Sequence, residues 1–227
     1  GYDGRLTSPD LHQALCEGLK DSGAKVINIG MGPTPMTYFA HYHLEADAVI
    51  MVTGSHNPSE YNGFKMVLNK HSFYAEDIQS LQKLIDQNDL KLKDGEIINK
   101  DIKKDYTERL LQNINLNKKI KIAWDIGNGA MGAVIKEITI NLDNSDSILI
   151  HEEVDGNFPN HHPDPTVPKN MEQLVKVVKD KNCDIGLAFD GDGDRLGVVD
   201  NLGNLVWADQ YMSVSYTHLR AHETFAN

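Results

Sequence analysis

The order of apolar runs and amphipathic segments is the feature that most constrains the fold of this chain. Ala46 to Val52 is a continuous apolar run, as expected for a strand buried on both faces of a parallel sheet. Similar runs at 120–125, 148–154 and 184–189, with shorter β segments at 25–29, 64–67 and 196–199, are predicted as strands. They alternate with helix-like segments at 8–23, 36–43, 75–88, 103–112, 131–138 and 171–181. Repeated strand, crossover helix and strand predict an α/β fold of two consecutive open layers with mainly parallel mixed sheets.

The 227 residues exceed the length of a typical single domain. A charged, irregular stretch from Lys91 to Asp101 separates two repeats of the pattern, so we expect domains over 1–100 and 101–212. The segment 213–227 breaks the pattern and resembles translated sequencing-adaptor sequence, so we expect it to lie outside both domains. At the other end, we interpret the polar loop from Tyr2 to Arg5 as the exit from a missing strand, and Ser8 as the N-cap of the first helix.

Charge and composition exclude several classes of function. The formal net charge of −11 argues against nucleic-acid binding, because a polyanion would be repelled. It permits a phosphorylated substrate, since a divalent cation and local basic residues can reverse the field inside a cleft. No apolar run approaches the roughly 18 residues that span a membrane. The two cysteines, Cys16 and Cys183, indicate no disulfide framework, and a cytoplasmic location is expected. The sequence indicates no oligomeric state.

The first chemical motif is Thr53-Gly54-Ser55-His56-Asn57-Pro58, followed by Asn62-Gly63-Phe64-Lys65. Gly54 permits a tight turn and Pro58 fixes the chain, which presents Ser55 on a constrained loop after a strand. Such a serine can act as a nucleophile or carry a phosphate, although the Ser-His pair alone is more typical of a plain polar turn. A serine hydrolase is disfavoured because its nucleophile elbow needs glycine two residues on either side of the serine.

The second motif is Asp190-Gly191-Asp192-Gly193-Asp194-Arg195. Three carboxylates at alternate positions, separated by glycines, can direct their oxygens to one point, which suits a hard cation such as Mg²⁺. A calcium EF-hand is excluded because Arg195 and Asn201 stand where that loop needs glycine and glutamate.

Three other features carry weaker signals. We interpret His161-His162-Pro163-Asp164 as a rigid loop rather than a metal cluster, because prolines and asparagines surround it. Gly127-Asn128-Gly129 follows a strand and is more typical of a tight turn into a helix than of a phosphate site. Arg5 is a lone cation on a loop, for which a solvated surface position is favoured without further context.

Together the two motifs resemble the phosphoserine loop and metal loop of the α-D-phosphohexomutases. Asp155 to Pro165 (DGNFPNHHPDP) is similar to a segment of the bacterial phosphomannomutase/phosphoglucomutase branch, and the order of the motifs matches the family from Gly1 to Met212. The resemblance implies a four-domain enzyme of which this chain holds the first two. It implies interconversion of hexose 1-phosphate and hexose 6-phosphate, of mannose and glucose rather than glucosamine, with a hexose 1,6-bisphosphate as activator and intermediate.

The resemblance also implies roles for particular residues. Ser55 carries the phosphoryl group, and Mg²⁺ is held by that group and by Asp190, Asp192 and Asp194. Around the transferring phosphoryl group lie Arg195, His56 and Lys65, with Lys65 a candidate for proton handling, and Arg5 lies on a segment that faces the active site.

Two alternatives remain at this point. An apolar strand that ends in Asp190-Gly191-Asp192 also suits the aspartyl nucleophile of a haloacid-dehalogenase-type, Mg²⁺-dependent phosphatase, although the Ser55 loop would then be unexplained. A non-catalytic module that binds sugar phosphate or metal belongs to a different class of function.

Overall fold

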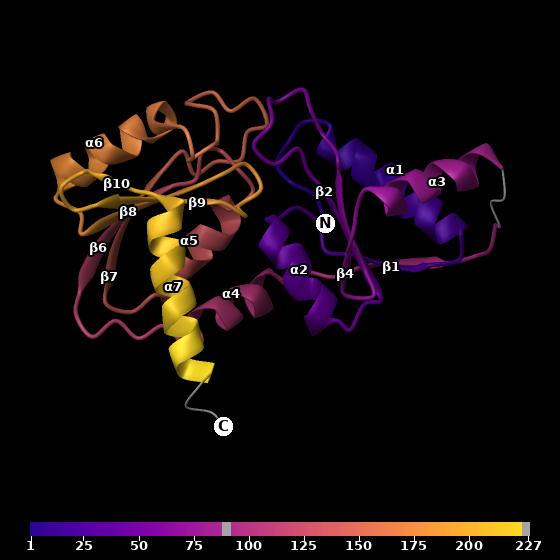
Figure 1. Ribbon diagram of the computed structural model, residues 1–227, viewed down its shortest axis with the longest axis horizontal. Coiled ribbons are helices and arrows are strands. Elements are labelled where there is room, and N and C mark those ends of the chain that lie inside the picture. The colour runs from indigo at the N-terminus through magenta and orange to yellow at the C-terminus, as the bar shows by residue number, and fades with distance from the viewer. Residues whose placement is uncertain (88–91, 224–227) are drawn as a thin grey trace.

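The structure is a computed structural model that describes residues 1–87 and 92–223 (Figure 1). Two lobes lie side by side, an N-terminal lobe (residues 1–99, indigo to magenta) and a C-terminal lobe (from residue 103, magenta to yellow). Among the described residues no helix combines the length and apolar character that crossing a membrane requires.

The N-terminal lobe contains two small sheets rather than one parallel sheet. Its elements are α1 (Ser8–Asp21), β1 (Lys25–Asn28), α2 (Thr34–His43), β2 (Ala48–Val52), β3 (Phe64–Leu68), β4 (His71–Phe73), α3 (Glu76–Asp86) and β5 (Glu96–Asn99). β1 pairs in parallel with β5, whereas β2, β3 and β4 form an antiparallel sheet. The apolar run that predicts a doubly buried parallel strand therefore has an antiparallel neighbour, and its parallel contact is a single bridge from Tyr2 to Val52.

The C-terminal lobe is built on one five-stranded mixed sheet. Its elements are α4 (Lys103–Leu111), β6 (Ile120–Asp125), α5 (Gly132–Asn141), β7 (Ser145–Ile150), the 3₁₀ helix η1 (Pro168–Met171), α6 (Glu172–Lys181), β8 (Ile185–Phe189), β9 (Leu196–Asp200), β10 (Leu205–Val206) and α7 (Ala208–Glu223). The strand order is β10-β9-β8-β6-β7, in which β7, β6 and β8 are parallel and β9 and β10 antiparallel. The predicted α/β class with mixed sheets is confirmed.

Helices cover both faces of this sheet, because alternate residues of β6 face opposite sides. Ala123 packs with Leu174 and Val178 of α6, whereas Trp124 packs with Val134 and other residues of α5. The apolar cluster around Trp124 continues across the lobe boundary to Ile29, Met36 and Ala40. A shared apolar core therefore holds α2 of the N-terminal lobe against α4 of the C-terminal lobe.

Several element boundaries differ from the sequence-based expectation. Ser8 is the first helical residue of α1 rather than its N-cap, and its hydroxyl donates to Asp3 Oδ1 at 2.5 Å. β7 begins and ends earlier than the predicted 148–154, and β5 lies inside the stretch interpreted as irregular. Asn88 and Lys91, which bound two of the predicted segments, lie outside the described residues. The segment 213–227, which we expect to lie outside both domains, begins inside α7, because that helix runs from Ala208 to Glu223.

Candidate functional site

Ser55 lies on the loop that follows β2 and points toward the aspartate loop of the other lobe. Its backbone is left-handed, with φ 51°, and its N–H donates to Thr53 Oγ1 at 2.8 Å. Its hydroxyl lies 3.3 Å from Asp190 Oδ2 and 3.3 Å from His56 Nδ1. The fold thus brings together the two motifs that the sequence singles out, although they are 135 residues apart.

Arg5 holds the Ser55 loop from behind. Its side chain is fully buried, and its two terminal nitrogens donate to four backbone carbonyls of this loop: Pro58 O at 2.6 Å, Tyr61 O at 3.0 Å, Ser55 O at 2.8 Å and Asn57 O at 2.7 Å. A Cβ at Gly54 would come within 2.5 Å of the guanidinium, so this approach requires glycine. The expected solvated surface position of Arg5 is therefore wrong, because its guanidinium is buried and donates its hydrogen bonds to the Ser55 loop.

Asp3 completes this support and is a residue that the sequence analysis does not identify. It is 1% exposed, and its Oδ2 accepts from Thr53 Oγ1 at 2.7 Å and from Gly54 N at 3.2 Å. The same oxygen lies 3.3 Å from Arg5 Nε, which balances the buried charge. The only sequence signal for this role is that Asp3 stands two residues before Arg5, in the same polar loop.

The aspartate loop connects β8 to β9 and presents its carboxylates to one point. Asp190 and Asp192 are fully buried, whereas Asp194 is exposed. Asp190 Oδ1 accepts from Asp194 N at 2.9 Å and from Arg195 N at 3.0 Å, and Gly193 takes φ 72°, which permits the curl. One oxygen from each aspartate lies within 4.8 Å of the others.

Lys65 of β3 is the cation closest to these carboxylates. Its Nζ lies 2.6 Å from Asp192 Oδ2 and 2.6 Å from Asp194 Oδ2. Burial opposes the charged form of Lys65, but the hydrogen bonds to both aspartates outweigh it and raise the lysine pKa. Burial, and then the charge of Asp192, raise the pKa of Asp190. One ammonium does not neutralise three carboxylates.

An oxygen of Asp192 that is unpartnered within the described part of the chain also indicates that the aspartate loop can hold a divalent cation. Asp192 Oδ1 is buried and, among the described residues, has no hydrogen-bond partner. A buried carboxylate oxygen without a partner is costly unless a cation contacts it. Carboxylate oxygens are the ligands of hard cations, so the loop is a candidate acidic metal site.

Helix α2 and the glycine turn after β6 support the aspartate loop. Thr34 N donates to Asp192 O at 2.8 Å, and the Thr34 hydroxyl donates to Asp192 Oδ2. A Cβ at Gly129 would lie 2.9 Å from Gly191 O, so the turn at 127–129 packs directly on the aspartate loop. The interpretation of this turn as structural agrees with these contacts, whereas Thr34 had no recognisable signal in the sequence.

The segment 161–165 lies beside both loops. His162 Nε2 donates to His56 O at 2.6 Å, and Asp164 Oδ1 lies 3.9 Å from Arg195 Nη1. Burial opposes ionisation of Asp164, but hydrogen bonds from Thr166 and the charges of His56 and Arg195 lower its pKa. Arg195 and His56 are therefore both close enough to Asp164 to act on its charge.

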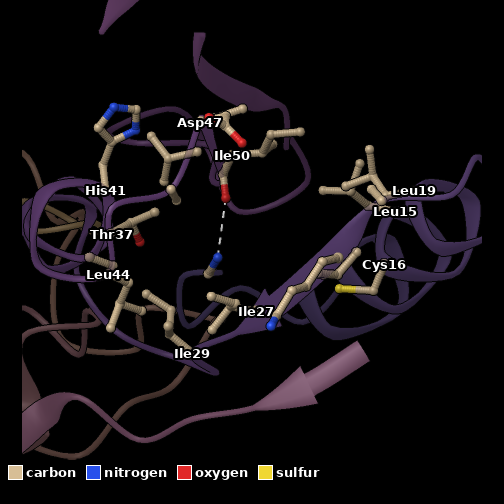
Figure 2. Close-up of a pocket in the computed structure, with 18 of the residues that line it drawn as sticks. Leu15, Cys16, Leu19, Ile27, Ile29, Thr37, His41, Leu44, Asp47 and Ile50 are labelled. Atoms are coloured by element: carbon tan, nitrogen blue, oxygen red, sulfur yellow. Dashed lines mark hydrogen bonds between the residues drawn. The ribbon is translucent and has the colours of Figure 1, made fainter. Parts of the chain in front are cut away.

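A separate cavity of about 550 Å³ lies behind β2, between α1 and α2 (Figure 2). Its lining is mainly apolar, with Leu15, Ile27, Ile29 and Ile50, and the amine of Gly1 donates to Ile50 O at 3.1 Å. Ser55 and the three aspartates are not among its lining residues. The cavity is thus distinct from the candidate site.

The sequence matches two family descriptions in the order in which the lobes occur. Residues 1–92 match "Phosphoglucomutase/phosphomannomutase, alpha/beta/alpha domain I", and residues 104–203 match domain II of the same family. A phosphomannomutase/phosphoglucomutase from Pseudomonas putida is 45% identical over 212 residues, which are 93% of this chain and 46% of that protein. A phosphoglucomutase from Neisseria gonorrhoeae is 44% identical over 214 residues, with the same coverage.

Solved structures agree with these matches. A phosphoglucomutase/phosphomannomutase family protein from Burkholderia thailandensis superposes with a TM-score of 0.92 at 38% identity, over 98% of this chain and 50% of that one. A putative phosphomannomutase from Thermus thermophilus gives a TM-score of 0.74 at 27% identity, over 90% of this chain and 48% of that one. The chain spans about half the length of the relatives it matches.

Proposed function

This chain belongs to the phosphoglucomutase/phosphomannomutase family, and we propose that it forms the phosphoryl-transfer half of a hexose phosphate mutase. The intact protein would interconvert hexose 1-phosphate and hexose 6-phosphate through a phosphoserine and a bisphosphorylated sugar. The observation that carries this proposal is the approach of the Ser55 hydroxyl to Asp190, which joins a constrained serine to a cation-binding loop. The phosphatase alternative leaves that serine without a role.

We assign the roles within the site from charge and distance. Ser55 carries the phosphoryl group, and Asp190, Asp192 and Asp194 would hold Mg²⁺ beside it. When bound, this ion supplies neutralisation of the phosphoryl oxygens as the bond to serine loosens. Arg195 adds positive charge and His56 adds hydrogen bonds beside the Ser55 loop, and Lys65 holds or moves a proton at the reacting hydroxyl of the sugar.

Arg5 and Asp3 act indirectly in this proposal. Every hydrogen bond of the Arg5 guanidinium goes to the Ser55 loop, so Arg5 positions the serine rather than contacting the substrate. Such fixed positioning matters because displacement of a reacting group by about 1 Å can cost on the order of 10²-fold in rate.

The remaining assignments are proposals of the same kind. The substrates are hexose phosphates, with mannose and glucose preferred over glucosamine, and a hexose 1,6-bisphosphate primes the serine. We place the domain boundary at residues 100 and 101, assign 213–227 to a tail outside the family, and propose a cytoplasmic location.

A phosphorylation experiment tests the serine mechanism. Because the chain spans about half of its relatives, residues 1–212 are joined to the remaining half of the Pseudomonas putida protein. Incubation with a hexose 1,6-bisphosphate should add one phosphate that is stable to hydroxylamine, as expected of a phosphoserine.

Two substitutions complete the test. Ser55→Ala should abolish the labelling, whereas Ser59→Ala, an exposed serine of the same loop, should leave it unchanged. A hydroxylamine-labile phosphate, or labelling that survives Ser55→Ala, contradicts the serine mechanism and favours an aspartyl phosphoenzyme.

A further inference from the structure

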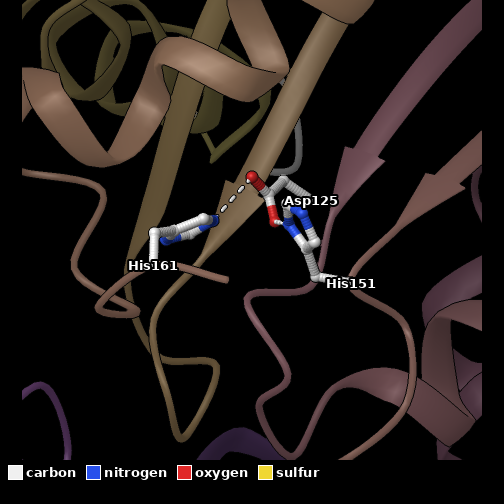
Figure 3. A group of neighbouring side chains, drawn as sticks. All are labelled: Asp125, His151 and His161. Carbon is white, nitrogen blue, oxygen red and sulfur yellow. Dashed lines mark hydrogen bonds and ion pairs between the residues drawn. The ribbon is translucent and has the colours of Figure 1, made fainter. Parts of the chain in front are cut away.

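Three side chains of the C-terminal lobe, none of them from the aspartate loop, meet at one place (Figure 3). Asp125 ends β6, His151 follows β7, and His161 lies on the loop before η1. Asp125 Oδ1 lies 2.9 Å from His151 Nδ1, and Asp125 Oδ2 lies 3.0 Å from His161 Nε2. One ligand atom from each residue lies within 4.8 Å of the others. The carboxylate thus lies between two imidazole rings.

The outer nitrogen of each ring is fixed by a second hydrogen bond. His161 Nδ1 lies 2.9 Å from the carbonyl oxygen of His162, which only accepts, so a hydrogen on this nitrogen is donated outward. His151 Nε2 lies 2.9 Å from Gln173 Oε1, and Gln173 is oriented because its amide nitrogen donates to Asn160 O at 3.4 Å. A neutral ring that donates outward therefore directs its lone pair at the carboxylate.

Lone pairs that face a carboxylate require positive charge between them, either ring protons or a cation. Two imidazole nitrogens and one carboxylate oxygen are the donors that zinc and neighbouring transition metals prefer. Histidine ligands characteristically donate their other N–H to a carbonyl or carboxylate, and the outer nitrogen of each ring here lies 2.9 Å from a carbonyl oxygen. We propose that Asp125, His151 and His161 bind a divalent transition-metal cation of the zinc class.

Burial and access agree with a bound cation. Asp125 is 1% exposed, and its Oδ1 also accepts from Gly127 N at 3.0 Å, which holds the carboxylate in place. His151 borders a hollow that Gln173, Lys176 and Asp180 also line, and the side chains of His151 and His161 are 11% and 12% exposed. Donors around a tetrahedral ion with bonds of about 2.1 Å lie roughly 3.4 Å apart, a separation between the two contact distances of 2.9 and 3.0 Å and the 4.8 Å limit for the three ligand atoms.

The site differs from the cluster that the sequence suggests at first sight. The adjacent residues of His161-His162-Pro163-Asp164 do not converge: His162 contacts His56 O and Asp164 faces Arg195, whereas His161 joins Asp125. An ion on His161 would therefore anchor the segment that contacts the Ser55 loop. The mutase proposal does not depend on this ion.

Metal titration of the purified chain tests the inference. The chain is stripped with a chelator and saturated with Mg²⁺, which prefers the oxygen ligands of the aspartate loop. Zn²⁺ is then titrated by calorimetry, and Co²⁺ in parallel for the visible absorption of a four-coordinate ion. We expect one ion per chain that Mg²⁺ does not displace, with affinity lowered at least tenfold by His151→Gln and about tenfold by Gln173→Leu.

The matched control is His71→Gln, which removes an exposed histidine of β4 and should leave the titration unchanged. Equal affinity in wild type and His151→Gln, or loss of binding under Mg²⁺, overturns the proposal. If His151→Gln does not fold, Gln173→Leu on the exposed side of α6 decides, because unchanged Zn²⁺ affinity in that variant also overturns it.

Discussion

Lys65 occupies a position between two carboxylates that a metal ion would also use. Both of its ion pairs have an N···O distance of 2.6 Å, and one partner, Asp192, also carries a buried oxygen without a hydrogen bond. An ion at the aspartate loop would therefore lie close to the ammonium, which already neutralises two of the same carboxylates. The lysine and the cation compete for the same charge.

We predict that Lys65→Met tightens Mg²⁺ binding to the chain by about fivefold, which corresponds to the ~1 kcal/mol of a partly exposed ion pair. Calorimetric titration measures it, with Lys70→Met as the control because Lys70 is exposed and makes a contact over the Tyr42 ring instead. Unchanged or weaker binding in Lys65→Met would show that the lysine does not compete with the ion.

We predict that Arg5→Lys destabilises the chain by about 3 kcal/mol or more, because an ammonium cannot donate to four carbonyls and leaves buried acceptors unpaired. Urea unfolding measures the loss. Arg109→Lys, at an exposed position of α4, should cost less than about 0.5 kcal/mol. A stability equal to wild type would mean that the loop does not depend on the Arg5 contacts.

Residues differ in how well the sequence reveals their role. Ser55 and the aspartates stand in short motifs with glycines at fixed spacing, and the structure brings them together as their chemistry requires. Arg5 and Thr34 act through backbone groups of segments far along the chain. Because such contacts form only between segments that are distant in sequence, local sequence does not encode them in a recognisable form.

At the scale of elements, α4 joins the lobes through a buried tyrosine. Tyr106 is 6% exposed and packs against Phe39 of α2 with ring centroids 5.5 Å apart. Burial opposes formation of the phenolate and raises the pKa of Tyr106 to about 12 from an ordinary value of 10.0. The unfolded chain thus loses this proton at lower pH than the folded chain.

We predict that this tyrosine lowers stability in alkaline solution. The protonated, buried tyrosine contributes fully to the free energy of unfolding below pH 10. This contribution is lost as the pH rises from 10 to about 12, because only the unfolded state ionises in that range. The free energy of unfolding of wild type should fall by about 2 kcal/mol more than that of Tyr106→Phe over this range. Tyr74→Phe, at an exposed position, should follow wild type; parallel curves for wild type and Tyr106→Phe would contradict the prediction.

The sequence predicts long helices and the central strands of the C-terminal lobe well, since their apolar periodicity is strong. β6 runs over the predicted residues, and α6 differs by one residue at its start. The strands that sequence analysis misses are short or lie on edges: β4, β5 and β10. β5 contains only exposed residues, so burial leaves no apolar pattern there to detect. The antiparallel pairing of β2 with β3 is likewise not predicted, because the apolar run from Ala46 to Val52 carries no information about the direction of its neighbour.

At the scale of the whole molecule, we predict that the 227-residue chain does not turn over hexose phosphates. The chain spans about half of its relatives, and positioning by a complete site can contribute about 7 to 11 kcal/mol of barrier reduction. A coupled assay from glucose 1-phosphate to glucose 6-phosphate, with Mg²⁺ and a bisphosphate primer, measures the rate. Turnover near 1 s⁻¹, the lower end of typical enzyme rates, would contradict the prediction.

The hydrogen bonds between Thr34 and Asp192 have a consequence for folding kinetics. They connect residues that are 158 positions apart, whereas most strand pairs of each lobe connect nearer segments. Closing so long a loop loses chain entropy before any contact compensates for it, and such contacts slow folding. Each lobe should therefore complete its own sheets first, so that the serine and the aspartates become neighbours only in a late docking step.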